Sequence, residues 1–174
     1  MLRLAATIGL ALGLAAAPAS AQLLQQNEDD FAFGISLGLG YASTEVSADE
    51  TADLLATQVG VSGILWSHWE AALDLRIDLD PATPDARVRS YTALLWVIAN
   101  LDLLPLTPFV GAGGGVVLDG TDPRLASGTI GACVGLALWF DPTWRLSLRG
   151  AQRWVFDDVG AMPLELLLTA DYYF

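Results

Sequence analysis

Hydrophobic and polar residues alternate along most of the chain, and this alternation predicts β-strands rather than helices. In the last eleven residues, every second position from Leu164 to Phe174 is apolar, while the other set is mostly polar or ionisable. Residues 69–79 divide even more completely, with apolar side chains at the odd positions and Glu, Asp, Arg or Ala at the even ones. A strand places alternate side chains on opposite faces, so each segment has one apolar face and one mixed face.

The same pattern predicts eight strands, joined by acidic or proline-containing connections and by tight turns at 67–68 and 141–143. The expected strands cover residues 31–42, 58–66, 69–79, 88–98, 107–118, 129–140, 144–153 and 164–174. In the fourth strand both faces carry large residues, and we favour an outward set of Tyr91, Ala93, Leu95 and Val97. Residues 43–57 are acidic and rich in Ser and Thr, which predicts a long loop with a short helix near 52–56 as an option.

The N-terminal 21 residues have the features of a secretory signal peptide. Arg3 precedes an apolar run over 4–17, Pro18 ends the run, and small residues at 19–21 predict cleavage before Gln22. The run is shorter than the roughly 20 residues that a spanning helix needs. We therefore expect a signal peptide over 1–21, a polar leader over 22–30 and one domain over 31–174.

Hydrophobic residues make up 53% of the chain, yet no later apolar run is long enough for a membrane helix. High hydrophobicity that alternates is typical of a transmembrane barrel, whose sheet must close because the bilayer offers no water to unpaired backbone groups. We predict an all-β fold, an eight-stranded antiparallel up-and-down transmembrane β-barrel. A soluble lipocalin-like barrel is the alternative, but it leaves the tryptophans at turns unexplained.

The aromatic residues form two expected membrane-interface girdles: Trp66, Trp69, Phe140, Trp144, Tyr172 and Phe174 at one end, and Tyr41, Tyr91, Trp154 and Phe156 at the other.

The last strand, with its alternating apolar residues and terminal Phe174, resembles the C-terminal strand of bacterial outer-membrane β-barrels. The pattern from Phe31 to Phe174 resembles the small barrels of the OmpA/OmpX type. The resemblance implies an outer-membrane location, a porin-like cell-envelope architecture, and recognition of Phe174 by the barrel-assembly machinery. It also implies contact with outer-membrane lipid and lipopolysaccharide and a structural or surface-interaction role, and we expect a monomer.

The formal charge of the whole chain is −12, and removal of Arg3 with the signal peptide makes it −13. Such an acidic chain without a basic patch disfavours nucleic acid as a partner. Cys133 is the only cysteine, so no intramolecular disulfide can form, and we predict no cofactor or metal centre. The loop acids could hold divalent ions that bridge lipopolysaccharide, or they are solvated loop tips; they are Glu45, Asp49, Glu50, Asp53, Asp119, Asp122, Asp157 and Asp158.

The inward faces carry charges of both signs, and an eight-stranded interior is just wide enough to be filled by side chains. We predict an interior ion network of Glu70, Asp74, Arg76, Asp78, Arg145, Arg149, Arg153, Glu165 and Asp171. If strands seven and eight pair around Val159, then Arg153 lies opposite Glu165 and Arg149 lies close to Asp171. The network predicts a polar plug; a narrow small-solute or ion channel is the alternative.

An outer-membrane lipid-modifying enzyme is the competing class of function. It would need a serine, a histidine and an acid in mutual contact. His68 is the only histidine, and its neighbours Ser67 and Glu70 lie at a tight turn, where adjacent residues rarely converge as a triad. The glycines of 111–115 are followed by valines and no lysine, so they do not form a phosphate-binding loop. We therefore expect no enzymatic activity.

Overall fold

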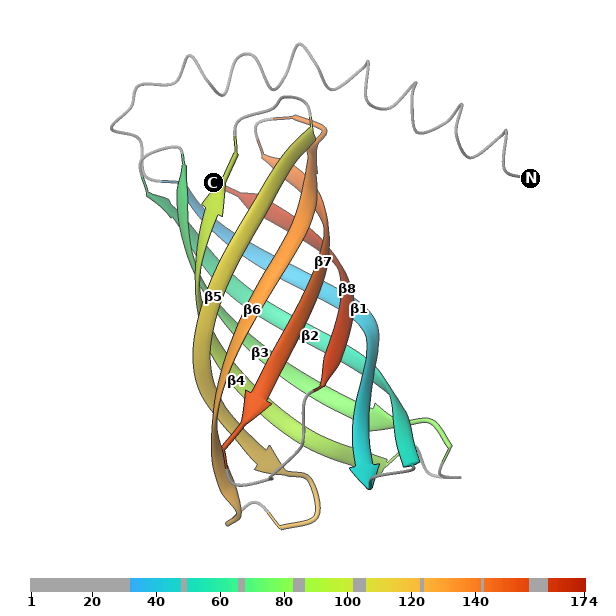
Figure 1. Cartoon of the computed structure of the whole chain (residues 1–174). Coiled ribbons are helices and arrows are strands. Elements are labelled where there is room, and N and C mark those ends of the chain that lie inside the picture. Colours follow the sequence, from blue (N-terminus) through green and yellow to red (C-terminus); the bar gives the residue numbers. More distant parts are fainter. Residues whose placement is uncertain are drawn as a thin grey trace, which may run out of the picture.

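The chain folds into a single closed β-barrel (Figure 1). The computed structural model describes residues 32–47, 50–65, 68–82, 87–101, 106–122, 124–141, 143–156 and 163–174. Within these ranges the strands are β1 (Ala32–Ser47), β2 (Glu50–Leu65), β3 (Trp69–Asp80), β4 (Arg87–Asn100), β5 (Leu106–Asp119), β6 (Ala126–Trp139), β7 (Trp144–Val155) and β8 (Leu164–Tyr173). The predicted signal peptide and polar leader lie outside the described residues.

Each strand pairs antiparallel with the next, and β8 pairs with β1 to close the sheet. The prediction of an eight-stranded antiparallel up-and-down barrel is therefore confirmed. We call the end that carries Tyr173 and the connections after β2, β4 and β6 the terminal end, and the opposite end the loop end. Among the described residues, no helix is long and apolar enough to cross a membrane.

The prediction of a long loop over 43–57, with an optional helix near 52–56, is wrong. β1 and β2 continue through this stretch, and their pairing runs from Ala32↔Ile64 to Ser47↔Glu50. Side-chain alternation also continues, because Leu54 and Ala56 face inward while Leu55 is exposed. Acidic residues disfavour a strand only weakly and threonine favours one, so hydrogen bonding to a neighbouring strand decides the conformation of this stretch.

The inward and outward faces of the other strands follow the predicted alternation, including the uncertain phase of β4. Tyr91, Leu95 and Val97 are exposed, whereas Leu94 and Trp96 are buried. A register shift opposite Asp78 and Leu79 leaves one extra residue in β4 between Val88 and Ser90, just before this segment.

The predicted register of β7 against β8 is wrong by two residues. In the sheet, Ala151 lies directly opposite Glu165 and Arg145 lies directly opposite Asp171. Arg153 is two positions beyond Ala151 and still forms an ion pair with Glu165. The hairpin is therefore centred one position before Val159. The alternation of apolar residues could not reveal this difference, because a shift of two residues keeps every side chain on the same face.

Candidate functional site: the barrel interior

The interior of the barrel contains charged groups on β3, β7 and β8. All five acids and four arginines of the predicted network are buried, none more than 8% exposed. Burying a charge is costly unless it is paired and hydrogen-bonded, so the contacts of these residues determine what the interior can do.

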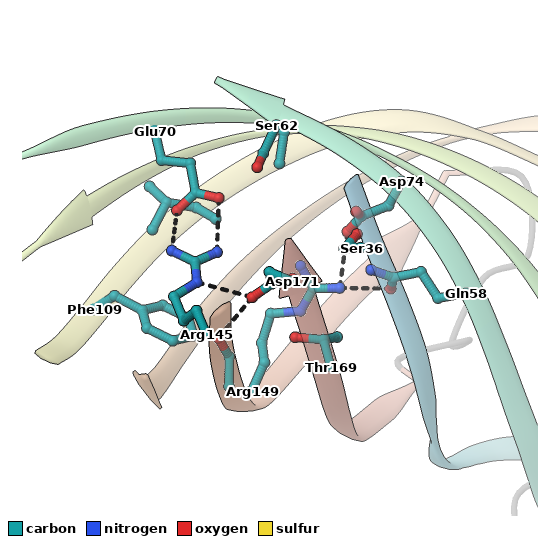
Figure 2. Close-up of a pocket in the computed structure, with 13 residues that line it drawn as sticks. Ser36, Gln58, Ser62, Glu70, Asp74, Phe109, Arg145, Arg149, Thr169 and Asp171 are labelled. Carbon is teal, nitrogen blue, oxygen red and sulfur yellow. Dashed lines mark hydrogen bonds and ion pairs between the residues drawn. The ribbon is translucent and has the colours of Figure 1, made fainter. Parts of the chain in front are cut away.

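The cluster nearest the terminal end is centred on Arg145 (Figure 2). Its guanidinium contacts Glu70 through two parallel hydrogen bonds, from Nη1 to Oε2 at 2.7 Å and from Nη2 to Oε1 at 2.9 Å. Its Nε donates to Oδ2 of Asp171 at 2.8 Å, and the hydroxyl of Ser147 donates to the same oxygen at 3.0 Å. Arg145 thus connects β7 to its neighbour β8 and, across the interior, to β3.

Two aromatic residues complete this cluster. The guanidinium carbon of Arg145 lies 5.4 Å from the ring centre of Trp139 and 5.0 Å from that of Tyr173. The Tyr173 hydroxyl donates to Oε1 of Glu70 at 3.1 Å. An arginine stacked on aromatic rings gains cation–π attraction in addition to its ion pairs.

Arg149 occupies the middle of the interior. Its Nη2 lies 2.8 Å from Oδ2 of Asp74 and donates to Oε1 of Gln58 at 2.7 Å. Its guanidinium carbon lies 5.2 Å from the ring centre of Trp96. This arginine therefore contacts Gln58 on β2 and Asp74 on β3 (Figure 2), and Trp96 on β4, from a position on β7.

The cluster nearest the loop end contains two arginines and two acids. Arg76 contacts Asp78 at 2.5 Å and also pairs with Glu165. Arg153 pairs with Glu165 as well, reaching it diagonally across the β7–β8 register, and lies 3.7 Å from Asp78. Ser90 donates a further hydrogen bond to Asp78 at 2.8 Å.

The wall formed by β4, β5 and β6 contains an apolar cluster, in contrast to the ion-paired wall. Its buried cluster includes Leu94, Trp96, Ile98 and Phe109. The Trp96 indole is fully buried, and it fits because two facing positions are glycines. A Cβ on Gly113 would lie 2.6 Å from Trp96 Cε3, and one on Gly131 would lie 3.2 Å from Cη2.

Sequence reasoning missed Trp96, Trp139 and Tyr173 as interior residues. Their alternation phase was the available signal, because Trp96 shares its face with Thr92, and Tyr173 shares its face with Asp171. Large aromatic residues were instead expected at the membrane interface. The structure shows that some of them fill the interior.

One cavity lies between the first two clusters, with a volume of about 30 Å³. Glu70, Asp74, Arg145, Arg149 and Asp171 border it. A cavity needs roughly 10–15 Å³ to hold one water molecule, so this one has room for about two. Its size suits trapped water and not a bound organic ligand.

Of the residues considered for catalysis, the structure describes Glu70 and His68, which lie in different environments. The Glu70 carboxylate faces the interior and is engaged by Arg145 and Tyr173, whereas His68 is exposed in the turn before β3. Ser67 lies outside the described residues. Across the described ranges, no group of three or more His, Cys, Asp or Glu side chains is placed to hold a metal ion.

The side chains of three of the loop acids, Asp53, Asp119 and Asp122, lie in the described part of the structure. Asp53 accepts a hydrogen bond from the Tyr41 hydroxyl, and Asp119 accepts hydrogen bonds from the backbone amides of Thr121 and Asp122 at 2.6 and 3.1 Å. The side chains of Glu45, Asp49, Glu50, Asp157 and Asp158 lie outside the described part of the structure.

The outer surface is apolar around the barrel and carries aromatic residues at both ends. Exposed aromatic side chains at the terminal end are Phe33, Trp69, Phe140, Trp144 and Phe174, with Tyr172 packed on Trp144 at a ring distance of 5.0 Å. Those at the loop end are Tyr41, Tyr91, Trp154 and Phe156. Trp66 lies outside the described residues.

A barrel that is apolar outside and ion-paired inside is the inverse of a soluble barrel and defines the class of small transmembrane β-barrels. Among solved structures, the chain is similar to Neisserial surface protein A, with 17% identity over 82% of this chain and 99% of that one, and a TM-score of 0.70. It is similar to the N-terminal β-barrel domain of Pseudomonas aeruginosa OprF, with 13% identity, coverage of 81% and 97%, and a TM-score of 0.61.

It is also similar to Ail, the attachment invasion locus protein of Yersinia pestis, with 10% identity, coverage of 83% and 99%, and a TM-score of 0.54. At these identities the similarity establishes a shared fold. No protein-family model matches the sequence, and no curated protein matches it significantly.

Proposed function

We propose that this chain is an integral protein of the bacterial outer membrane with a structural or surface-interaction role, and that its interior is a polar plug. The observation that carries the proposal is the ring of exposed apolar side chains around an ion-paired interior. Leu37 is 66% exposed and Val134 is 64% exposed, whereas Asp74 and Arg76 on the inner face are 3% and 2% exposed. This distribution is stable in lipid and unfavourable in water.

The orientation follows from the connections and the aromatic residues. Short turns belong on the periplasmic side of such barrels, and the connections after β2, β4 and β6 are shorter than those after β3, β5 and β7. The β1–β2 connection is short, but its hairpin extends beyond the neighbouring strands, so the terminal end is proposed as the periplasmic end. The aromatic residues at the two ends then lie at the two headgroup regions. Outer-membrane lipid and lipopolysaccharide are the proposed contacts of a monomeric barrel. The shared fold with an attachment invasion locus protein favours a surface-interaction role for the loop end.

Export and assembly are part of the same proposal. Residues 1–21 direct export, and the assembly machinery recognises the last strand through Phe174. The amide of Phe174 donates to the carbonyl of Phe33 at 2.9 Å, and the two rings lie 5.4 Å apart. The terminal aromatic residue therefore lies at the seam where β8 meets β1, the position from which a signal for closure is read most directly.

A heat-modifiability gel tests the membrane assignment. The detergent-extracted outer-membrane fraction is run boiled and unboiled, because a closed barrel resists SDS until it is heated. The expected result is a faster-migrating unboiled band in that fraction. Recovery in the soluble periplasmic fraction, with no mobility shift, would contradict the proposal and support a soluble binding barrel.

Planar-bilayer recording separates the plug from the channel. The wild-type protein is expected to show no steady conductance, because Arg149 and its partners fill the middle of the interior. Arg149→Ala is expected to produce brief openings, whereas Leu148→Ala, a change on the outer face of the same strand, is expected to produce none. A steady wild-type conductance that Arg149→Ala abolishes would contradict the plug and assign an ion path through Arg149.

A further inference from the structure

Ion pairs across the interior connect β3 and β7, which are not neighbours in the sheet. The acids of β3 follow one another at intervals of four residues, and so do the arginines of β7. The three contacts are Glu70–Arg145 at 2.7 Å, Asp74–Arg149 at 2.8 Å and Asp78–Arg153 at 3.7 Å. Every acid contacts the arginine 75 positions further along the chain, as 145 − 70, 149 − 74 and 153 − 78 all give 75. We call these three contacts the β3–β7 ladder.

The register of the closed sheet places the residues of the β3–β7 ladder across the interior from one another. Following the paired residues from Asp74 through β2, β1 and β8 leads to Arg145 on β7. Following them the other way, through β4, β5 and β6, leads to Val155. The two endpoints differ by ten residues (155 − 145). This difference is the shear of the barrel, the number of residues by which the register is displaced after one circuit of the sheet. The position directly across the interior lies midway between them, at 150, next to Arg149.

The seam between β1 and β8 has no turn to fix its register, because these are the first and last strands. Its sequence does not fix the register either. The outward residues are apolar on both strands, and the inward residues of β1 between 34 and 42 are Gly, Ser or Ala. A slip that places Leu39 opposite Leu166 instead of Leu168 leaves an apolar residue opposite an apolar residue outside. It leaves a glycine or serine opposite each inward side chain of β8 from Glu165 to Asp171. Strands with such sequences specify their register weakly.

We propose that the β3–β7 ladder selects the register of the β1–β8 seam and thereby the shear of the barrel. After the slip, the path from Asp74 through the seam ends at Ser147, so the shear falls from ten to eight (155 − 147). The position facing Asp74 moves by one residue, roughly 3.3 Å along the strand. A shift of that size takes contacts of 2.7 and 2.8 Å out of hydrogen-bonding range and affects all rungs together. Buried charges then lose their partners, which disfavours the slipped barrel.

A narrower interior also conflicts with the packing of the apolar wall. Lower shear reduces the diameter of a barrel with a fixed number of strands. Trp96 is already fully buried against β5 and β6, and Gly113 leaves no space on one side of its ring. The Trp96 indole therefore disfavours the same slip as the ladder. Unlike the ladder, it does so through the width of the interior and not through the alignment of β7 with β3.

Disulfide trapping across the seam tests the proposal. In a Cys133→Ala background, which removes the single native thiol, Leu39→Cys/Leu168→Cys reports the observed register and Leu39→Cys/Leu166→Cys reports the slipped one. Both pairs lie on the outer face, where a diffusible oxidant reaches them. The measured quantity is the ratio of slipped to native cross-linking in the heat-modifiable fraction.

The ladder is weakened by Asp74→Asn, and the matched control is Asp171→Asn, whose partners Arg145 and Ser147 both lie on β7, on the same side of the seam. Both variants remove one buried aspartate and keep its side-chain volume, but the control leaves every rung of the ladder and the Arg76–Glu165 contact between β3 and β8 in place. The ladder variant is expected to raise the slipped-to-native ratio several-fold, while the control keeps the wild-type ratio even where its folded yield falls. An unchanged ratio in the ladder variant, or an equal rise in the control, would overturn the proposal.

A second variant, in which one rung of the ladder is made neutral, tests the proposal where Asp74→Asn yields no folded barrel. Asp74→Leu/Arg149→Met removes both charges of the middle rung together, so it leaves no buried charge unpaired by the change. The proposal expects a raised slipped-to-native ratio for this variant too. A wild-type ratio would show that packing, and not the ladder, sets the register.

Discussion

Gly113→Ala is the substitution whose effect the structure determines most directly. An alanine Cβ at this position would lie 2.6 Å from the carbonyl oxygen of Leu95 and 2.6 Å from Trp96 Cε3. Both distances are far below van der Waals contact. The first atom belongs to the backbone of a paired strand, and the second to a rigid ring that is fully buried. The ring cannot retreat toward β6, because Gly131 gives it only a narrow space there.

Overpacking of a filled interior costs about 1–3 kcal/mol, occasionally more. Replacing glycine by alanine also restricts the unfolded chain, which returns about 0.4–1 kcal/mol where the native backbone accepts alanine. After this gain is subtracted, we expect Gly113→Ala to lower the free energy of unfolding by about 0.5–2.5 kcal/mol. Reversible urea unfolding in lipid vesicles, followed by tryptophan fluorescence and by heat-modifiability, measures this difference.

Gly114→Ala is the matched control, since it is the same substitution one position along the same strand. Its Cβ would point to the opposite face, with the nearest atoms the carbonyl oxygen of Thr129 at 3.4 Å and Ile130 Cγ2 at 3.8 Å. We expect a change within about 0.5 kcal/mol, as for surface substitutions generally. Equal effects of the two substitutions would refute the packing of Trp96 against Gly113. Adding Trp96→Leu to Gly113→Ala should restore only part of the loss, because the contact with the Leu95 carbonyl remains.

Two further predictions concern single polar contacts. Glu70→Gln removes the charge facing Arg145 and should cost about 3–5 kcal/mol in the same unfolding assay, whereas Glu70→Gln/Arg145→Met, which removes both charges, should cost less. Asp141 lies in the turn between β6 and β7, and hydrogen bonds from Thr143, through its hydroxyl and amide, and from the amide of Trp144 lower the pKa of its carboxyl. Its contribution to stability is therefore fully present above the ordinary carboxyl range near about 4 and is lost as pH falls through the lowered folded-state pKa. Asp141→Asn should reduce stability at neutral pH and converge with wild type at acidic pH; a constant difference across the series would contradict this account.

The architecture could be predicted because each strand carries its own alternation. β3 and β6 show this most directly, since a period of two decides which side chains face the interior without knowledge of any partner strand. Composition misled at 43–57, where Ser, Thr and acidic residues indicated a loop. Backbone pairing between β1 and β2 extends the strands through this stretch, although its side chains are not those typical of a strand.

The predicted interior charges could be named from one sequence, but their partners could not. A register shift of two residues keeps every side chain on the same face of the sheet. The alternation of residues alone could therefore not predict that Arg145 pairs with Asp171. Contacts across the interior depend on the shear. Because the shear is set by the registers of all strand pairs together, the sequence of one strand does not determine it. The interior positions of Trp96 and Tyr173 follow from the alternation phase of their strands. Residue type alone does not indicate them, because aromatic residues also suit the membrane interface.

The β1–β2 pairing extends beyond the positions where their other neighbours end. β1 pairs with β8 only as far as Ser43 and β2 pairs with β3 only from Leu55, while the two strands remain joined to Ser47 and Glu50. The loop end therefore carries a preformed two-stranded arm. A macromolecule that binds there meets backbone already fixed by hydrogen bonds, so association does not have to order a flexible segment. A slow-exchanging set of amides between 44 and 54 would be the physical mark of such an arm.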